Sequence, residues 1–89
     1  MSNWRVEFTP KAEKQFQKLD RQTQKQIRDF LRFRILESND PYISGKALVE
    51  DLSGFWRYRV GKYRIICDIQ DKLLIIEIIS IAKRDKVYR

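Results

Sequence analysis

Histidine is absent from this chain, and cysteine occurs only once. Transition-metal sites are built mostly from histidine and cysteine, and serine or cysteine nucleophiles depend on a histidine base, so both kinds of site are excluded. Any chemistry must use lysine, arginine, tyrosine, aspartate or glutamate. The single Cys67 cannot form an internal disulfide, and its place on an apolar strand face predicts a small core residue rather than a reactive thiol.

The sequence also lacks a long apolar run and a signal peptide, which predicts a cytoplasmic protein with no membrane partner. Its 89 residues, 43% hydrophobic and 35% charged, suit one domain over residues 1–89. Lysine and arginine total 19 against 12 acidic residues, and this net charge of +7 predicts an anionic partner. Residues 57–89 hold nine basic and four acidic side chains, so the excess lies mostly at the C-terminal end.

Apolar periodicity and capping residues predict the order strand, helix, helix and three strands. Residues 4–8 alternate as a strand, and Thr9 followed by Pro10 suits the start of a helix. Asp20 suits the start of a second helix that runs to about residue 37, with an inward stripe of Ile27, Phe30, Leu31 and Ile35.

Residues 42–54 read as a loop with one helical turn at most, and residues 72–82 are apolar enough for a strand buried on both sides. The predicted fold is therefore α+β: a small antiparallel sheet, a helical hairpin packed on one of its faces, and a short C-terminal tail.

The stretch FWRYRVGKYRII, residues 55–66, predicts a β-hairpin that turns at Gly61 and Lys62. In this register one face is apolar and becomes core; its members are Trp56, Tyr58, Val60, Tyr63, Ile65 and Cys67. The other face carries Arg57, Arg59 and Arg64, with Arg59 directly opposite Arg64. Like charges in that position destabilise a sheet, which favours anion binding over a merely solvated surface.

The segment LSGFWRYRVGKYRII, followed by a buried strand and SIAKRDKVY, resembles the RelE family of bacterial toxin–antitoxin systems, within the RelE/ParE toxin superfamily. The likeness covers essentially the whole chain. It implies a ribosome-dependent endoribonuclease that cuts mRNA in the decoding site and uses no metal or other cofactor. It also implies a cognate antitoxin that wraps and neutralises the toxin, with mRNA and ribosomal RNA as further partners.

The resemblance also implies site residues. Two basic positions on the first hairpin strand match Arg57 and Arg59, the arginine of the second strand matches Arg64, and later positions match Arg84 and Tyr88. Such arginines would stabilise charge on the phosphoryl oxygens while a 2′-hydroxyl attacks phosphorus to give a 2′,3′-cyclic phosphate. A tyrosine would stack on a displaced base. Further phosphate-binding candidates are Lys62, Lys83 and Lys86.

The proton acceptor is a separate question, because the best-known family pattern has lysines at the positions of Arg57 and Arg59. Arginine stays protonated at neutral pH and is a poor base. Lys46 is the candidate, since neighbouring cations favour the neutral form of an amine. Glu50 is its rival, and a solvated loop lysine is an equally good interpretation of Lys46.

Two other functions fit the same predicted fold. One is a ParE-like inhibitor of DNA gyrase without nuclease chemistry, and the other is an inactive RNA-binding relative.

Overall fold

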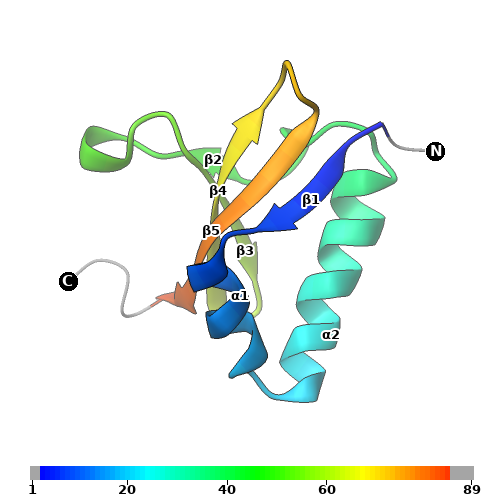
Figure 1. Ribbon diagram of the computed structural model, residues 1–89, viewed down its shortest axis with the longest axis vertical. Helices are drawn as coiled ribbons and strands as arrows, with labels where there is room; N and C mark the ends of the chain where they lie inside the picture. The colour runs from blue at the N-terminus through cyan, green and yellow to red at the C-terminus, as the bar shows by residue number, and fades with distance from the viewer. Residues whose placement is uncertain (1–2, 85–89) are drawn as a thin grey trace.

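The computed structural model describes residues 3–84 and contains one five-stranded sheet with helices packed against it (Figure 1). The elements in chain order are β1 (Arg5–Phe8), α1 (Pro10–Gln17), α2 (Arg21–Asp29) with its π-helical continuation η1 (Phe30–Leu36), β2 (Lys46–Ala47), the 3₁₀ turn η2 (Glu50–Leu52), β3 (Trp56–Val60), β4 (Tyr63–Gln70) and β5 (Ile75–Lys83). This arrangement confirms the predicted α+β fold and its helical hairpin.

The sheet has the strand order β1-β5-β4-β3-β2. Strands β3 to β5 are antiparallel, as predicted, and β2 is antiparallel to β3. β1 runs parallel to β5, so the sheet is mixed rather than wholly antiparallel. Tight turns force β3, β4 and β5 to alternate in direction, whereas the helical hairpin after β1 leaves its direction free. The two-residue β2 lies in the segment that was expected to be a loop, which also contains the expected helical turn, η2.

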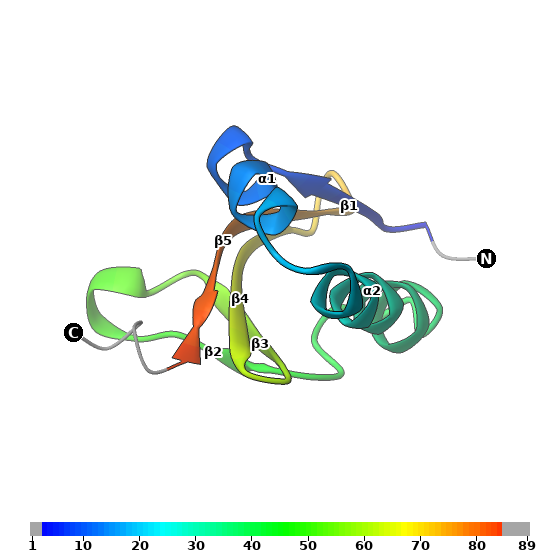
Figure 2. The ribbon, with the colours of Figure 1, turned by 90° about the horizontal axis from the view of Figure 1, so that it is seen from below.

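Both helices begin at the predicted capping residues. Thr9 Oγ1 accepts a hydrogen bond from the Ala12 amide at 3.1 Å, and Asp20 Oδ1 accepts one from the Thr23 amide at 2.8 Å. Each bond satisfies an amide that the first turn of a helix leaves without an intrahelical partner. Figure 2 shows α2 on one side of the curved sheet and the η2 turn on the other.

The core lies between α2 and the sheet. Ile27, Leu31 and Ile35 from the helix are buried with a set of strand residues that includes Tyr58, Val60, Ile65, Cys67, Ile76, Ile78 and Ile81. The predicted hairpin register is confirmed, with Trp56 paired with Cys67, Tyr58 with Ile65 and Val60 with Tyr63. Trp56 and Tyr63 are half-buried at the margin of this core. β5 lies between β1 and β4, a central strand as expected. Its burial on both sides is only partly confirmed, because Ile76, Ile78 and Ile81 are buried whereas the residues of its other face are half-buried.

Candidate functional site

The three hairpin arginines lie on the sheet face that points away from the core. Arg59 is directly opposite Arg64, as the turn predicted, and Arg57 is opposite Ile66. The three differ in exposure: Arg59 is exposed, but Arg57 is only 8% exposed and Arg64 only 6%. Two of the three arginines therefore hold their side chains within the structure.

The strand order explains this difference. Arg57 has a neighbour on each side, Lys46 on β2 and Ile66 on β4. Arg64 likewise lies between Arg59 on β3 and Ala82 on β5. The long apolar stems of arginine pack readily against such neighbours. Arg59 pairs with Arg64 on β4, but the pairing of β2 with β3 stops at Arg57, so Arg59 has a paired strand on one side only.

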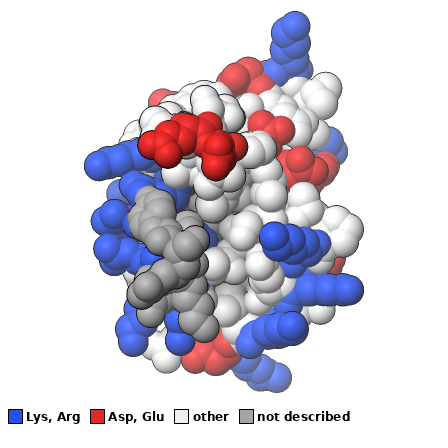
Figure 3. All heavy atoms as spheres, turned by 90° about the vertical axis from the view of Figure 1, so that its left-hand side faces the viewer, with Lys and Arg blue, Asp and Glu red and all other residues white. Residues whose placement is uncertain are grey.

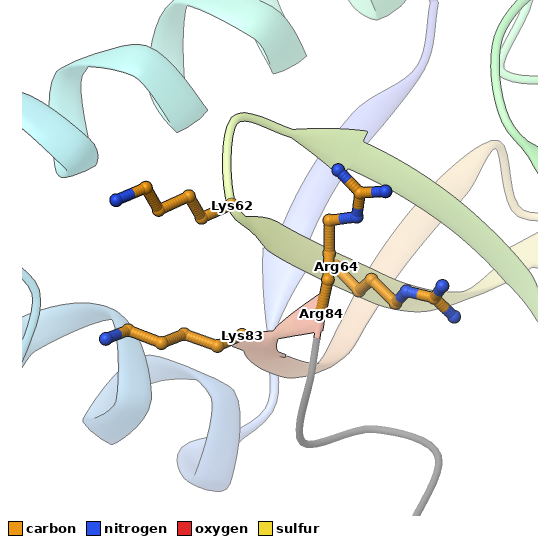
Figure 4. Close-up of a pocket in the computed structure, with 4 residues that line it drawn as sticks. All are labelled: Lys62, Arg64, Lys83 and Arg84. Carbon is orange, nitrogen blue, oxygen red and sulfur yellow. The ribbon is translucent and has the colours of Figure 1, made fainter.

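Four of the predicted residues meet at one hollow. Lys62, Arg64, Lys83 and Arg84 line it, where the beginning of β4 meets the end of β5 (Figure 4). The Arg84 amide donates a hydrogen bond of 2.8 Å to the Lys62 carbonyl, which fixes the end of β5 against the hairpin turn. In Figure 4 the two lysines extend in the same direction, while the two arginines point away from them in two different directions. We call this the first hollow.

A second hollow lies at the β2–β3 edge and is lined by Phe30, Ser44, Gly45, Lys46, Arg57 and Arg59. Lys46 pairs directly with Arg57 across the two strands, so the structure brings the candidate base to the arginine-bearing strand. Glu50, the rival, is exposed on η2 and lines neither hollow. The catalytic role of Lys46 stays a prediction.

Within positions 3–84, seven of the residues that line these two hollows are lysines or arginines, and none is acidic. Figure 3 shows a group of lysine and arginine atoms on the left, beside and below a patch of acidic atoms, and further basic atoms at the lower right. A cleft lined by charges of one sign focuses the field and attracts ions of the opposite sign. This part of the surface is therefore suited to bind phosphate groups.

The same sheet face carries an acidic row that sequence reasoning missed. Glu77 on β5 lies directly opposite Glu7 on β1 and Asp68 on β4. Gln70 Nε2 donates to Asp68 Oδ2 at 3.2 Å and to Glu77 Oε1 at 3.4 Å. Asp68 and Glu77 come from consecutive strands, but Glu7 lies about seventy residues earlier on β1, so only knowledge of the β1–β5 pairing could have revealed the whole row.

The remaining predictions have mixed outcomes. Lys86 and Tyr88 lie outside the described residues. Cys67 is fully buried, and burial raises the pKa of its thiol to about 12, which agrees with a core role. No group of three or more histidine, cysteine, aspartate or glutamate side chains in the described part of the chain is arranged to hold a metal ion. Among residues 3–84, no helix is long and apolar enough to cross a membrane.

Comparison with known proteins gives consistent results. Residues 6–88 match the family model described as the ParE toxin of the type II toxin–antitoxin system parDE. A curated relative, Toxin RelE of Mycobacterium tuberculosis, is 43% identical over 51 residues, which are 57% of this chain and 53% of the relative. The chain therefore spans about half the length of the curated relative that it matches.

Solved structures resemble the whole fold. The toxin–antitoxin complex RelBE2 of M. tuberculosis superposes with a TM-score of 0.82 and 26% identity, covering 94% of each chain. The isolated RelE toxin of E. coli gives a TM-score of 0.74 with 24% identity, covering 96% of this chain and 90% of that one. By the extent of the family match and the agreement in fold, the chain belongs to the RelE/ParE family of toxins from type II toxin–antitoxin systems.

Proposed function

We propose that this toxin is an endoribonuclease that cuts mRNA on the ribosome and thereby inhibits translation. The observation that carries the proposal is the convergence of Lys62, Arg64, Lys83 and Arg84 on one hollow. Arg59, directly opposite Arg64, adds a further cation that lines the second hollow. The mutual repulsion of such closely placed cations decreases when a phosphate group binds between them.

The chemistry suited to this site needs no metal. The 2′-oxygen forms a bond to phosphorus, the bond from phosphorus to the 5′-oxygen breaks, and a 2′,3′-cyclic phosphate and a 5′-hydroxyl result. A base takes the proton of the 2′-hydroxyl, and the departing oxygen gains a proton. Negative charge grows on the phosphoryl oxygens, where the guanidinium groups of Arg64 and Arg84 can each contact two oxygens and remain charged. Such preorganised donors stabilise the transition state.

Lys46 is the proposed base. Its strand places it opposite Arg57, and it lines the second hollow together with Arg59. Glu50 lies on an exposed turn and lines neither hollow, so it is the weaker candidate.

The proposed partners are a cognate antitoxin, the ribosomal decoding site, mRNA and ribosomal RNA. The similar folds include complexes of RelE with RelB from E. coli, Methanococcus jannaschii and Pyrococcus horikoshii. These complexes support the proposal of a cognate antitoxin for this chain. The net charge of +7 favours an acidic antitoxin segment as well as RNA.

Mapping RNA ends after brief expression in cells tests the proposed function. We expect new 5′ ends within translated reading frames, and these should disappear when translation initiation is blocked, because cleavage requires mRNA in the decoding site. RNA that binds but stays intact would instead indicate an inactive RNA-binding relative.

One observation favours a second candidate function. The matching family model is named for ParE, and a ParE-like inhibitor of DNA gyrase would have the same fold without nuclease activity. The same expression experiment separates the two, because a gyrase inhibitor leaves mRNA intact while plasmid supercoiling decreases.

A further inference from the structure

Lys46 stands on the least supported strand of the sheet. β2 has two residues, lies at the edge and pairs only with β3. Beyond this pairing, the Leu48 amide donates to the Phe55 carbonyl at 3.0 Å. So few backbone bonds hold a segment loosely, and segments of this kind open readily. A side chain that must meet a reacting atom from such a strand needs other means of support.

Two aromatic side chains of β3 supply that support. Trp56 Nε1 donates a hydrogen bond of 2.8 Å to the Ser44 carbonyl, and the Tyr58 hydroxyl donates one to the Pro41 carbonyl. Burial raises the pKa of Tyr58 above its ordinary range, so its hydroxyl keeps the proton that it donates. The chain that leads into β2 is thus tied to β3 at two points before Lys46.

A third aromatic residue, Tyr42, lies within the segment itself and anchors it to the sheet. The ring of Tyr42 packs edge-on against Trp56 with ring centroids 5.0 Å apart. Its hydroxyl donates to the carboxylate of Asp71, with oxygen–oxygen distances of 2.9 and 3.0 Å. Asp71 lies in the turn between β4 and β5, so the segment is anchored to two parts of the sheet.

Gly45 allows the segment to approach β3 closely. Its φ is +91°, and a Cβ at this position would lie 2.3 Å from the Arg57 carbonyl oxygen and 2.6 Å from Trp56 Nε1. Only glycine fits such a contact without displacing its neighbours. The backbone before Lys46 therefore rests directly on the strand that carries Arg57.

From these contacts we infer that Trp56 and Tyr58 are positioning residues that hold Lys46 opposite Arg57. The alternating pattern of β3 then has two functions: Arg57 and Arg59 lie on one face, and the two tethering aromatic residues lie on the other. For its effect on cleavage, this inference rests on the proposed role of Lys46. The tether itself can be measured without any cleavage assay.

Tyr58→Phe tests the tether because it keeps the buried ring and removes only the hydroxyl. We expect amide hydrogen exchange at positions 46–48 to be roughly fivefold faster or more, as for the loss of one hydrogen bond, with α2 unchanged. The matched control is Tyr63→Phe, a half-buried tyrosine of the same hairpin face whose hydroxyl forms no hydrogen bond with residues 41–45 in the described structure. Unchanged exchange at positions 46–48 in Tyr58→Phe would overturn the tether.

Cleavage measurements test what the tether does. Tyr58→Phe should lower kcat about tenfold and leave KM for the RNA unchanged, because the base is displaced while the phosphate-binding side chains stay in place. In a Lys46→Met background, Tyr58→Phe should cause no further loss. If the two losses multiply, Tyr58 acts through something other than Lys46 and the inference is wrong.

Two further outcomes are distinct. If Lys46→Met keeps the parent rate and pH profile, Lys46 is not the base, and a role for the tether in positioning it is overturned. If the parent chain cleaves no RNA at all, the proposed function fails, and the exchange rates alone decide whether Tyr58 holds the segment.

Discussion

Arg64 combines burial with a position at the first hollow, which it lines together with Arg84 (Figure 4). We expect Arg64→Ala to lower the single-turnover cleavage rate by about 10²–10³, the usual effect of removing one preorganised donor to a transition state. Arg64→Lys should recover part of the rate, since it restores the charge but not the planar fork.

Thermal unfolding is the control for this pair of variants, because Arg64 is only 6% exposed. If Arg64→Ala and Arg64→Lys lose the same activity and both have a lowered melting temperature, Arg64 supports the fold rather than the reaction.

Cys67 provides a prediction about pH. Burial raises its pKa from an ordinary value of 9.0 to about 12, so the native thiol stays neutral where the unfolded thiol ionises. Its contribution to the free energy of unfolding is therefore complete below pH 9 and is lost as pH rises toward 12. Denaturant titrations at pH 9 and above should show declining stability that is less steep in Cys67→Ala. A disulfide reagent should modify the native thiol only after unfolding.

The shared face and the pairing of the hairpin arginines were predictable from the sequence, but the burial of Arg57 and Arg64 was not. Alternation and the Gly61 turn define which residues share a face and which pair across the strands. The neighbours that cover Arg57 and Arg64 come from β2 and β5, outside the hairpin. Their pairing depends on the tertiary fold and not on the hairpin turn.

At the scale of the element, two glycines form a natural pair for comparison. Gly45 and Gly54 both have positive φ, +91° and +97°, but a Cβ at Gly54 meets nothing within 4 Å. Gly54→Ala should therefore cost about 1–2 kcal/mol from backbone strain alone. Gly45→Ala should cost more, because the new methyl group collides with the backbone of β3, and it should also slow cleavage by moving Lys46.

Chemical denaturation measures both costs, and cleavage assays follow for variants that fold. Similar stability losses for the two substitutions would contradict the close approach of residues 41–45 to β3.

The helices and the arginine hairpin could be predicted because each has a local signal. Thr9 and Asp20 each cap a helix by accepting a hydrogen bond from the amide three residues later in the chain. The hairpin turn likewise sets the register of the two strands that it joins. β2 has no such signal, since two residues cannot show a period. The parallel direction of β1 also lacks one, because β1 pairs with residues about seventy positions later in the chain.

At the scale of the whole molecule, the charge distribution predicts the response to salt. Neutralising Lys62 and Lys83 together, as glutamines, should reduce the slope of log affinity for single-stranded RNA against log salt by about 1.4, from about 0.7 per phosphate contact. Arg28→Gln on α2 with Arg32→Gln on η1, both at exposed positions, is the charge-matched control and should change the slope less. Equal changes in both double variants would indicate unspecific attraction by net charge.

The same distribution predicts insensitivity to chelators. The hollows are lined by cationic side chains, which repel a divalent metal ion and can themselves stabilise phosphoryl charge. Cleavage should proceed at the parent rate in excess EDTA, measured under conditions in which the ribosomes stay intact. Strong inhibition there would sink the proposed metal-free mechanism.

The acidic row of Glu7, Glu77 and Asp68 limits the route that a bound RNA strand can take. Asp68 follows Arg64 by four residues on β4, a separation of about 13 Å along the strand. If RNA binds at the hollows as proposed, a path along β4 toward this row would bring its phosphates against three carboxylates. The RNA would then have to cross the sheet near the hollows, and the toxin would contact only a few nucleotides.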